Sequence, residues 1–255
     1  MKHRFGQLGA LLLAALLCLQ CATPALAAQD SGTVTVSSAE DLLALAKHCS
    51  LDTWSQGRTV ILTQDISLSG ADFAPIPTFG GVFDGGGHTI SGLKVTGSYS
   101  PAGLFGIVQE GAEIRNLYVS GTVTPGGKGG ETGGIAGRNS GLIANCSFSG
   151  SVAGDNSVGG VAGVNQETGK LQNCAASGAV SGKSMTRGVA GKNLGVVDSC
   201  QNQCMVNTES VDPGVSLDDL DLSATDSLFT LRAMDTINVA TDTGGVVGYS
   251  SGLVL

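Results

Sequence analysis

The phrase GGIAGRNSG at residues 133–141 returns as GGVAGVNQETG from residue 159, as RGVAGKNLG from residue 187 and as GGVVGYSSG from residue 244. Gly134, Gly160 and Gly188 occupy the same position in the first three copies, and an insertion precedes the last. Their spacing lies within the period of roughly 20–50 residues that is typical of solenoids, in which each repeat packs on its neighbours. The phrase therefore predicts a repetitive fold rather than a phosphate-binding loop or a linker.

The sequence that follows each phrase repeats as well. IANCSFSGSV at residues 143–152 matches LQNCAASGAV at 171–180, IRNLYVSGTV at 114–123 precedes them, and VDSCQNQCMV at 197–206 is a divergent fourth copy. Each unit contains apolar runs of three to six residues between Gly, Asn and Ser, a pattern that indicates short strands. Three such strands make one coil of a parallel β-helix, so the predicted fold class is all-β.

Equivalent residues of stacked coils lie about 4.8 Å apart and form ladders along the axis. Ile143 and Leu171 are expected to stack inward. Asparagine amides can bond to each other along the axis, so we expect a ladder at one corner, formed by Asn116, Asn145 and Asn173. We expect a second ladder at a turn that tolerates left-handed backbone, formed by Asn139, Asn165 and Asn193. The glycines of the phrase are predicted to turn the corners of each coil.

Five cysteines follow residue 27, an odd number that leaves at least one thiol unpaired in a monomer. Three of them occupy one position of successive coils, namely Cys146, Cys174 and Cys200. We interpret this column as small buried core residues. A disulfide between neighbouring coils and metal binding are alternatives. Metal binding is disfavoured because no histidine lies in the repeats to complete a site.

Residues 1–27 resemble a cleaved secretory leader. Lys2, His3 and Arg4 form a basic start, and an apolar run extends over residues 11–17. Ala25 and Ala27 then supply small residues at the two positions that a signal peptidase reads. The apolar run is too short to span a bilayer. We therefore predict secretion of a mature chain without a membrane span.

A segment of different character precedes the repeats, and we assign residues 28–98 to an N-terminal cap and entry coils. Ser38 precedes the run AEDLLALAKHC as the expected N-cap. Asp41, three residues on, occupies the capping-box position that Glu or Gln usually holds. The helix that this predicts has one apolar face, formed by Leu42, Leu45, Ala46 and Cys49. We expect it to cover the open end of the first coil, because an exposed sheet edge invites aggregation.

Two stretches carry a resemblance to known families. FAPIPTFGGVFDGGGHTISGL at residues 73–93 resembles the entry segment of secreted bacterial β-helix proteins of the pectate-lyase-like class. GGIAGRNSG and GGVAGVN, with NCSFSGSV and NCAASGAV, resemble the GLUG repeat of bacterial surface proteins. The resemblance covers roughly residues 33–255, with the GLUG-type repeats over residues 99–255. It implies a right-handed parallel β-helix, secretion, and attachment to or display on the cell surface. It implies no activity, since the repeat accompanies both adhesins and surface peptidases.

Composition narrows the functional classes. After the leader the chain carries 11 basic and 21 acidic residues, a net charge of −10 that argues against nucleic acid as a partner. The repeats show no pair of carboxylates, and no nucleophile with its base, that would indicate catalysis. We therefore predict a non-enzymatic module of an adhesin-like surface protein that contacts glycans, host proteins or cell-surface proteins. The alternatives are a polysaccharide lyase or glycoside hydrolase on the same fold, and the non-catalytic part of a surface peptidase.

One acidic stretch interrupts the repeats, within an insertion at about residues 207–242. Its sequence, VDPGVSLDDLDLSATD, gathers carboxylates that suit calcium, and the expected ligands are Asp218, Asp219 and Asp221. A solvated acidic loop is the alternative. No other cofactor is expected.

The last phrase begins a coil that earlier copies continue. Residues 244–255 read GGVVGYSSGLVL and stop before the Asn-Cys pair and the strand that follow the earlier copies. The predicted coil is incomplete and offers unpaired backbone groups. We expect either a longer parent chain or end-to-end self-association through this coil.

Overall fold

The computed structural model describes residues 32–71, 73–127, 130–207 and 241–255. The chain divides into two units, Met1–Asp30 and Ser31–Leu255, and the fold below is that of the second. The predicted leader and the expected calcium ligands Asp218, Asp219 and Asp221 lie outside the described residues. Within the described ranges, no helix has the length and apolar character that crossing a membrane requires.

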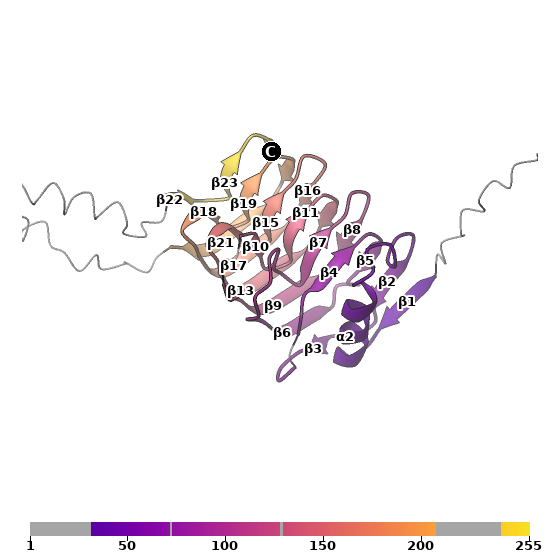
Figure 1. The fold of residues 1–255 in the computed structure, drawn as a ribbon. Coiled ribbons are helices and arrows are strands. Elements are labelled where there is room, and N and C mark those ends of the chain that lie inside the picture. Colours follow the sequence, from indigo (N-terminus) through magenta and orange to yellow (C-terminus); the bar gives the residue numbers. More distant parts are fainter. Residues whose placement is uncertain (1–31, 72, 128–129, 208–240) are drawn as a thin grey trace, which may run out of the picture. The chain divides into compact units, whose positions relative to one another are not determined.

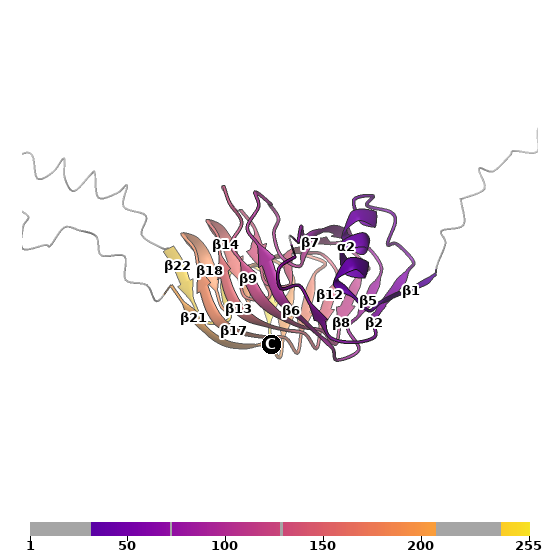
Figure 2. The same cartoon turned by 90° about the horizontal axis from the view of Figure 1, so that it is seen from below.

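The described strands form four parallel sheets that run side by side along one solenoid (Figures 1 and 2). Sheet A contains β1 (Thr33–Val36), β2 (Thr59–Leu62), β5 (Val82–Asp84), β8 (Glu113–Arg115), β12 (Leu142–Ala144), β16 (Lys170–Gln172), β20 (Val196–Asp198) and β24 (Leu253–Val254). Sheet B contains β3 (Ile66–Ser67), β6 (Thr89–Val95), β9 (Tyr118–Val123), β13 (Ser147–Ala153), β17 (Ala175–Ser181) and β21 (Gln201–Val206). The predicted parallel β-helix is confirmed.

The other two sheets complete each coil. Sheet C contains β4 (Ile76–Phe79), β7 (Phe105–Val108), β11 (Ala136–Asn139), β15 (Ala162–Asn165), β19 (Ala190–Asn193) and β23 (Val247–Ser250). Sheet D contains β10 (Thr132–Gly133), β14 (Asn156–Gly159), β18 (Ser184–Arg187) and β22 (Thr241–Gly244). The chain passes through sheets A, B, D and C in turn, so a coil such as β12-β13-β14-β15 contributes one strand to each.

The prediction of three strands per coil is wrong for the later coils, which have a fourth in sheet D. In the coil before β10, the corresponding segment makes only an isolated bridge, between Ala102 and Thr132. Pro101 immediately precedes that bridge. Proline has no N–H to donate to a ladder, so a regular strand does not form there.

The core consists of columns of inward-facing apolar side chains. In sheet A, Ile143 stacks on Leu171 in register, and both are fully buried. Towards the N-terminal end three phenylalanines pack together, with ring centroids 5.3–5.9 Å apart, namely Phe79, Phe83 and Phe105. Burial of each such side chain contributes about 1.5–3 kcal/mol to folding.

Helix α2 (Ala39–His48) caps the N-terminal end, as the sequence predicts (Figure 1). It buries Leu42 and Leu45 and contacts β4, the terminal strand of sheet C. Ser38 Oγ accepts a hydrogen bond from Asp41 N, but the Asp41 carboxylate accepts from Ser37 N, at 2.9 Å, rather than from Ser38 N. The expected capping box therefore closes one residue earlier, on the residue before the N-cap.

A buried asparagine ladder runs through three coils. Asn139 Nδ2 donates to Asn165 Oδ1, and Asn165 Nδ2 donates to Asn193 Oδ1, each at 2.8 Å. All three side chains are fully buried at the ends of β11, β15 and β19. Each amide also donates to the carbonyl of a glycine in the following turn, Gly141, Gly169 or Gly195. The ladder thus satisfies polar groups that burial would otherwise destabilise.

The left-handed backbone belongs to the other ladder, so the expectation for Asn139, Asn165 and Asn193 is wrong. Asn116, Asn145 and Asn173 have φ values of 52°, 53° and 51°. Asn145 Nδ2 donates to Asn116 Oδ1 at 3.4 Å, and Asn173 Nδ2 donates to Asn145 Oδ1 at 3.2 Å. Asparagine tolerates this conformation better than most residues, which explains its recurrence at this corner.

The glycines of the repeated phrase serve close packing rather than left-handed turns. A Cβ on Gly134 would lie 2.2 Å from Phe148 Cγ, and one on Gly160 would lie 2.3 Å from Gly188 O, yet neither has positive φ. The phrase lies at the corner between sheets D and C. The prediction that these glycines turn corners is correct for their place, but the physical reason is space.

The three cysteines of the column lie just before β13, β17 and β21 and point into the coil. Cys146 and Cys174 are 2% and 1% exposed, and Cys200 is partly buried. All five described cysteines are free thiols. In the preceding coil the same position holds Leu117, which is fully buried.

Candidate functional site

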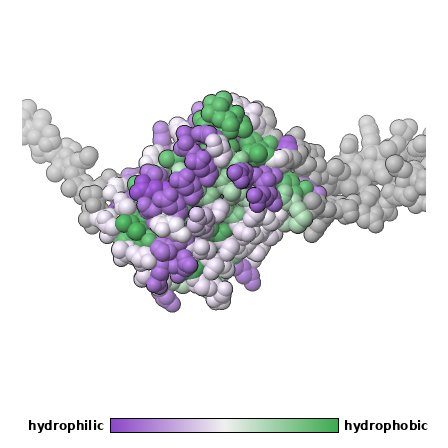
Figure 3. Space-filling model, turned by 180° about the vertical axis from the view of Figure 1, so that it is seen from behind, coloured by the Kyte–Doolittle hydropathy of each residue, from purple (hydrophilic) through white to green (hydrophobic). Residues whose placement is uncertain are grey.

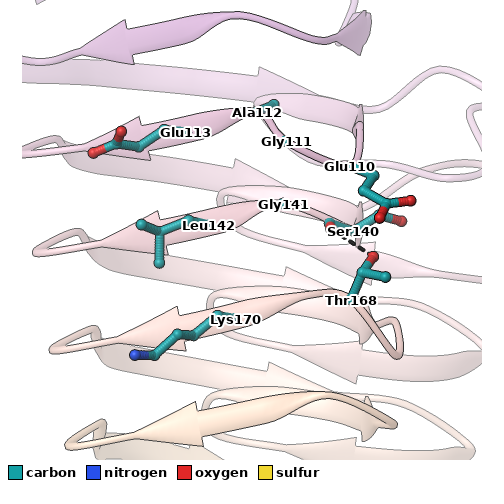
Figure 4. Close-up of a pocket in the computed structure, with 9 residues that line it drawn as sticks. All are labelled: Glu110, Gly111, Ala112, Glu113, Ser140, Gly141, Leu142, Thr168 and Lys170. Carbon is teal, nitrogen blue, oxygen red and sulfur yellow. Dashed lines mark hydrogen bonds between the residues drawn. The ribbon is translucent and has the colours of Figure 1, made fainter.

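A groove lies where three successive turns connect sheet C to sheet A (Figure 4). The turns from β7 to β8 and from β15 to β16 each have four residues, 109–112 and 166–169. The turn between them, from β11 to β12, has only two, Ser140 and Gly141. The short turn is recessed between its longer neighbours, and the hollow has a volume of about 340 Å³. This size is at the lower end of the range for small-molecule pockets.

Hydrogen bonds between coils hold the floor of the groove. Thr168 Oγ1 donates to Ser140 O at 2.8 Å (Figure 4). The backbone continues the pattern, because Leu142 N donates to Ala112 O and Lys170 N to Gly141 O. The full lining is Glu110, Gly111, Ala112, Glu113, Ser140, Gly141, Leu142, Thr168 and Lys170. A ligand would therefore meet a surface whose shape is set by the solenoid.

The charged side chains of the groove do not converge on one point. Glu110 lies at the end near Ser140 and Thr168, whereas Glu113 and Lys170 extend toward the opposite end (Figure 4). Glu113 Oε1 accepts a hydrogen bond from Arg115 Nη1 at 3.1 Å, and Lys170 Nζ lies 3.8 Å from Asp198 Oδ2. Hydroxyl, carboxylate and ammonium groups spread along a shallow surface suit hydrogen bonds to a hydroxyl-rich ligand. They do not form a general acid–base pair around one bond.

An ion-pair network lies beside the groove on the outer face of sheet A. Asp84 Oδ2 accepts from Arg115 Nε at 2.9 Å, and Asp84 Oδ1 accepts from Gly86 N and Asn116 Nδ2. Burial alone would raise the pKa of Asp84, but the hydrogen bonds from Gly86, Asn116 and Arg115 hold that pKa below its ordinary value. The Asp84 carboxylate therefore lies at one end of the corner ladder, where it accepts a hydrogen bond from Asn116.

We expect Asp84→Asn to reveal this network in the pH dependence of stability. A carboxyl with a lowered pKa in the folded state stabilises the fold above its unfolded pKa of about 3.9, and the stabilisation is lost as pH falls through the lower folded value. The free energy of unfolding of the wild type should exceed that of the variant by about 1 kcal/mol at neutral pH. The expected difference is small because the carboxylate is partly exposed to solvent. Urea unfolding should show a constant difference in stability between wild type and variant from pH 7 to about pH 4. The difference should shrink as the pH falls further, to about pH 3. A difference independent of pH would contradict the assignment.

Other charged side chains also have partners in neighbouring segments. Arg138 donates to both carboxylate oxygens of Glu131 at 2.8 Å, and Lys183 Nζ lies 3.1 Å from Asp155 Oδ1. The hydrogen bonds from Arg138 to Glu131 raise the pKa of Arg138. Glu131 directly precedes β10 and Arg138 lies on β11, so this ion pair joins two segments of one coil.

Sequence reasoning missed the carboxylates of the groove. Glu110 and Glu113 lie ahead of the best-aligned repeats and attract no attention in the sequence. The available signal is a lengthening of the repeat interval, since the step from Gly160 to Gly188 is longer by two than the step from Gly134 to Gly160. The extra length is that of the longer turn at 166–169. Among the described residues, no group of three or more His, Cys, Asp or Glu side chains is placed to hold a metal ion.

The last coil exposes apolar side chains. Strands β22, β23 and β24 pair with β18, β19 and β20, and within the described ranges sheet B has no strand beyond β21. Leu253, Val254 and Leu255 are 51%, 47% and 69% exposed. Figure 3 shows hydrophobic and hydrophilic side chains interspersed over one face, with a hydrophobic patch at its top. The expected end-to-end self-association stays a prediction.

Comparisons with known proteins support the fold more firmly than a function. No family model matches the chain, so the likeness to GLUG repeats stays a resemblance. A halomucin of Haloquadratum walsbyi is 32% identical over 161 residues, which are 56% of this chain and 2% of that protein. The chain thus spans a very small part of the curated relative that it matches.

A solved structure shares the solenoid. The crystal structure of a protein described as a candidate immunoglobulin A1 protease from Bacteroides ovatus superposes with a TM-score of 0.52 at 21% identity. The match covers 66% of this chain and 56% of the other. At this identity the likeness concerns the fold alone, and it agrees with the parallel strands described above.

Proposed function

We propose that this chain is a secreted, non-enzymatic β-helix module of a bacterial surface or adhesin-like protein, and that its groove contacts glycans. The observation that carries the proposal is the groove itself, a hollow across three coils that has hydrogen bonds between coils at its floor and charged side chains that do not converge on one point. Support for an extracellular setting comes from the likeness to a halomucin and to a candidate immunoglobulin A1 protease.

The chemistry of the groove favours neutral sugars or amino sugars over uronates. The lining contains two carboxylates, Glu110 and Glu113, and one ammonium group, Lys170, so acidic side chains outnumber basic ones in it. Carboxylates accept hydrogen bonds from sugar hydroxyls and attract an amino group, but they repel the carboxylate of a uronic acid. The expected partner is therefore an oligosaccharide of neutral or amino sugars.

A turn transplant tests the groove. Replacing Ser140 and Gly141 with Gln-Glu-Thr-Gly, the sequence of residues 166–169, would lengthen the recessed turn and fill the hollow. We expect binding of the preferred oligosaccharide to weaken by about tenfold or more, while thermal stability changes little because a surface turn tolerates two extra residues. Calorimetric titration with neutral, amino-sugar and uronate oligosaccharides measures the effect.

A matched control is available in the next coil. Leu194 and Gly195 form another two-residue turn between the same two sheets and do not line the groove. The same tetrapeptide placed there should leave binding unchanged. Equal loss in both variants, or no binding to any member of the panel, contradicts the proposal.

The fold likeness to a candidate protease favours one second function. The chain would then be a non-catalytic part of a surface peptidase, and the groove would contact a protein substrate. Binding to a glycosylated protein that survives removal of its glycans would support this alternative. Cleavage of a polysaccharide by the purified chain would instead support the lyase or hydrolase alternative.

A further inference from the structure

The cysteine column brings thiols of successive coils into register. Gln201 N donates to Cys174 O at 2.8 Å, and Ala175 N donates to Cys146 O at 3.0 Å, so each cysteine stacks on the next. In-register residues of neighbouring strands lie about 4.8 Å apart. The Cα atoms of a disulfide lie about 4.4–6.8 Å apart. Both steps of the column therefore have a backbone spacing that a disulfide can adopt.

The two steps differ in access from outside. All three thiols point toward backbone carbonyls: Cys146 toward Ala144 O, at 3.1 Å, Cys174 toward Gln172 O and Cys200 toward Asp198 O, each at 3.4 Å. Cys200 is partly exposed, whereas Cys146 and Cys174 are buried. Only the step from Cys174 to Cys200 combines the spacing of a disulfide with a thiol that an external disulfide can reach.

The pKa values of the two thiols shift in opposite directions. The hydrogen bond from Cys174 lowers the pKa of Cys200, and the same bond together with burial raises the pKa of Cys174. A thiolate is the form of cysteine that attacks a disulfide. Cys200 is also the partly exposed member of the pair, so it is the attacking sulfur and the buried Cys174 is the resolving one.

We propose that Cys174 and Cys200 are a disulfide-forming pair that joins two neighbouring coils by exchange with a small-molecule or protein disulfide. The Cys200 thiolate attacks that disulfide, forms a mixed disulfide and expels one thiolate. Cys174 then loses its proton, attacks the Cys200 sulfur and expels the second thiolate. Two electrons and two protons pass to the oxidant, which becomes two thiols, and one intramolecular S–S bond forms.

The bond would hold a strand that has few other restraints. Cys200 immediately precedes β21, and β21 is the terminal strand of sheet B within the described ranges, paired only with β17. A covalent link at its start would keep the strand paired with β17. Closure of the 174–200 loop also restricts the unfolded chain. We expect oxidation to raise the melting temperature by roughly 5–10 °C.

Peptide mapping of the full chain tests the proposal. After equilibration with oxidised glutathione, the protein is quenched in acid, denatured, alkylated and digested. We expect one linked peptide pair, containing Cys174 and Cys200, together with the rise in melting temperature. Cys200→Ser should abolish both effects and Cys146→Ser neither.

Three outcomes would overturn it. They are complete alkylation of Cys174 and Cys200, a link from Cys174 to Cys146, and a link from Cys200 to Cys204. Cys200→Ala is the second variant should the serine variant not fold, since alanine removes the sulfur without adding a polar group to the coil. The wild-type linkage is read from the unaltered chain and does not depend on either variant.

Discussion

Gly160→Ala is expected to destabilise the solenoid by about 4 kcal/mol or more, enough to unfold its central coils. The added methyl group would lie 2.3 Å from Gly188 O and 2.5 Å from the Cβ of Ala176. Backbone atoms of the next coil cannot retreat without breaking the hydrogen bond from Gly160 N to Gly188 O. The free energy of unfolding, measured in urea by circular dichroism, should therefore fall steeply.

The same column supplies the control. Gly188 N donates to Gly245 O, so Gly245 is the equivalent residue in the last coil. A Cβ added to Gly245 has no atom within 4 Å. Gly245→Ala should change stability by less than about 0.5 kcal/mol. If the two variants were equally stable, close packing would not explain the repeated glycine.

Asn165→Leu is expected to cost about 2–4 kcal/mol, because it removes the middle of the buried ladder. The variant deprives Asn139 Nδ2 of an acceptor and Asn193 Oδ1 of a donor. Both partners are fully buried and cannot turn to solvent instead. Leucine has a similar volume, so the loss reports hydrogen bonding more than packing.

The corner ladder provides the comparison for this prediction. Asn145 also bonds along the axis, to Asn116 and Asn173, but it is exposed and has a φ of 53°. Asn145→Ala should cost only about 1 kcal/mol, mainly from the strained backbone, and Asn145→Gly should be close to neutral. Unfolding of a solenoid is not strictly two-state, so midpoints under identical conditions are the quantity to compare. An Asn145→Ala loss as large as that of Asn165→Leu would contradict the distinction between the ladders.

Much of the fold could be predicted because each coil must place the same residue types at the same positions. Ile143 and Leu171 are aligned in the sequence and stack in the structure. Sheet D could not be predicted in the same way. Its first strand is only Thr132 and Gly133, a pair with neither an apolar run nor alternation, and its pairing comes from the neighbouring coils rather than from local propensity.

The two asparagine ladders show that residue type alone does not determine backbone conformation. Asparagine is favoured both in left-handed backbone and at the end of a strand where its amide bonds to a turn. Asn145 has the first role and Asn165 the second. Both positions hold asparagine, so alignment of the repeats identifies each column but not its backbone conformation.

The groove follows from the lengths of the turns, which an analysis of residue types does not consider. Its hollow comes from one turn that is shorter than its neighbours, and the sequence shows this only as one repeat interval that is shorter than the next. Glu110 and Glu113 reach the hollow from the coil that precedes the first copy of the phrase. The chemistry of the site therefore depends on which turns become neighbours, and that follows from the stacking of coils.

Because the sheets join each described coil to the coils directly before and after it, the solenoid has a distinctive response to mechanical load. Tension applied through the ends acts along the direction of the hydrogen bonds between coils and opens them one row at a time. Each detached coil releases the chain of one repeat, roughly 90–100 Å when fully extended. A tether built in this way lengthens in steps and dissipates a pull gradually, while the coils still stacked keep their shape.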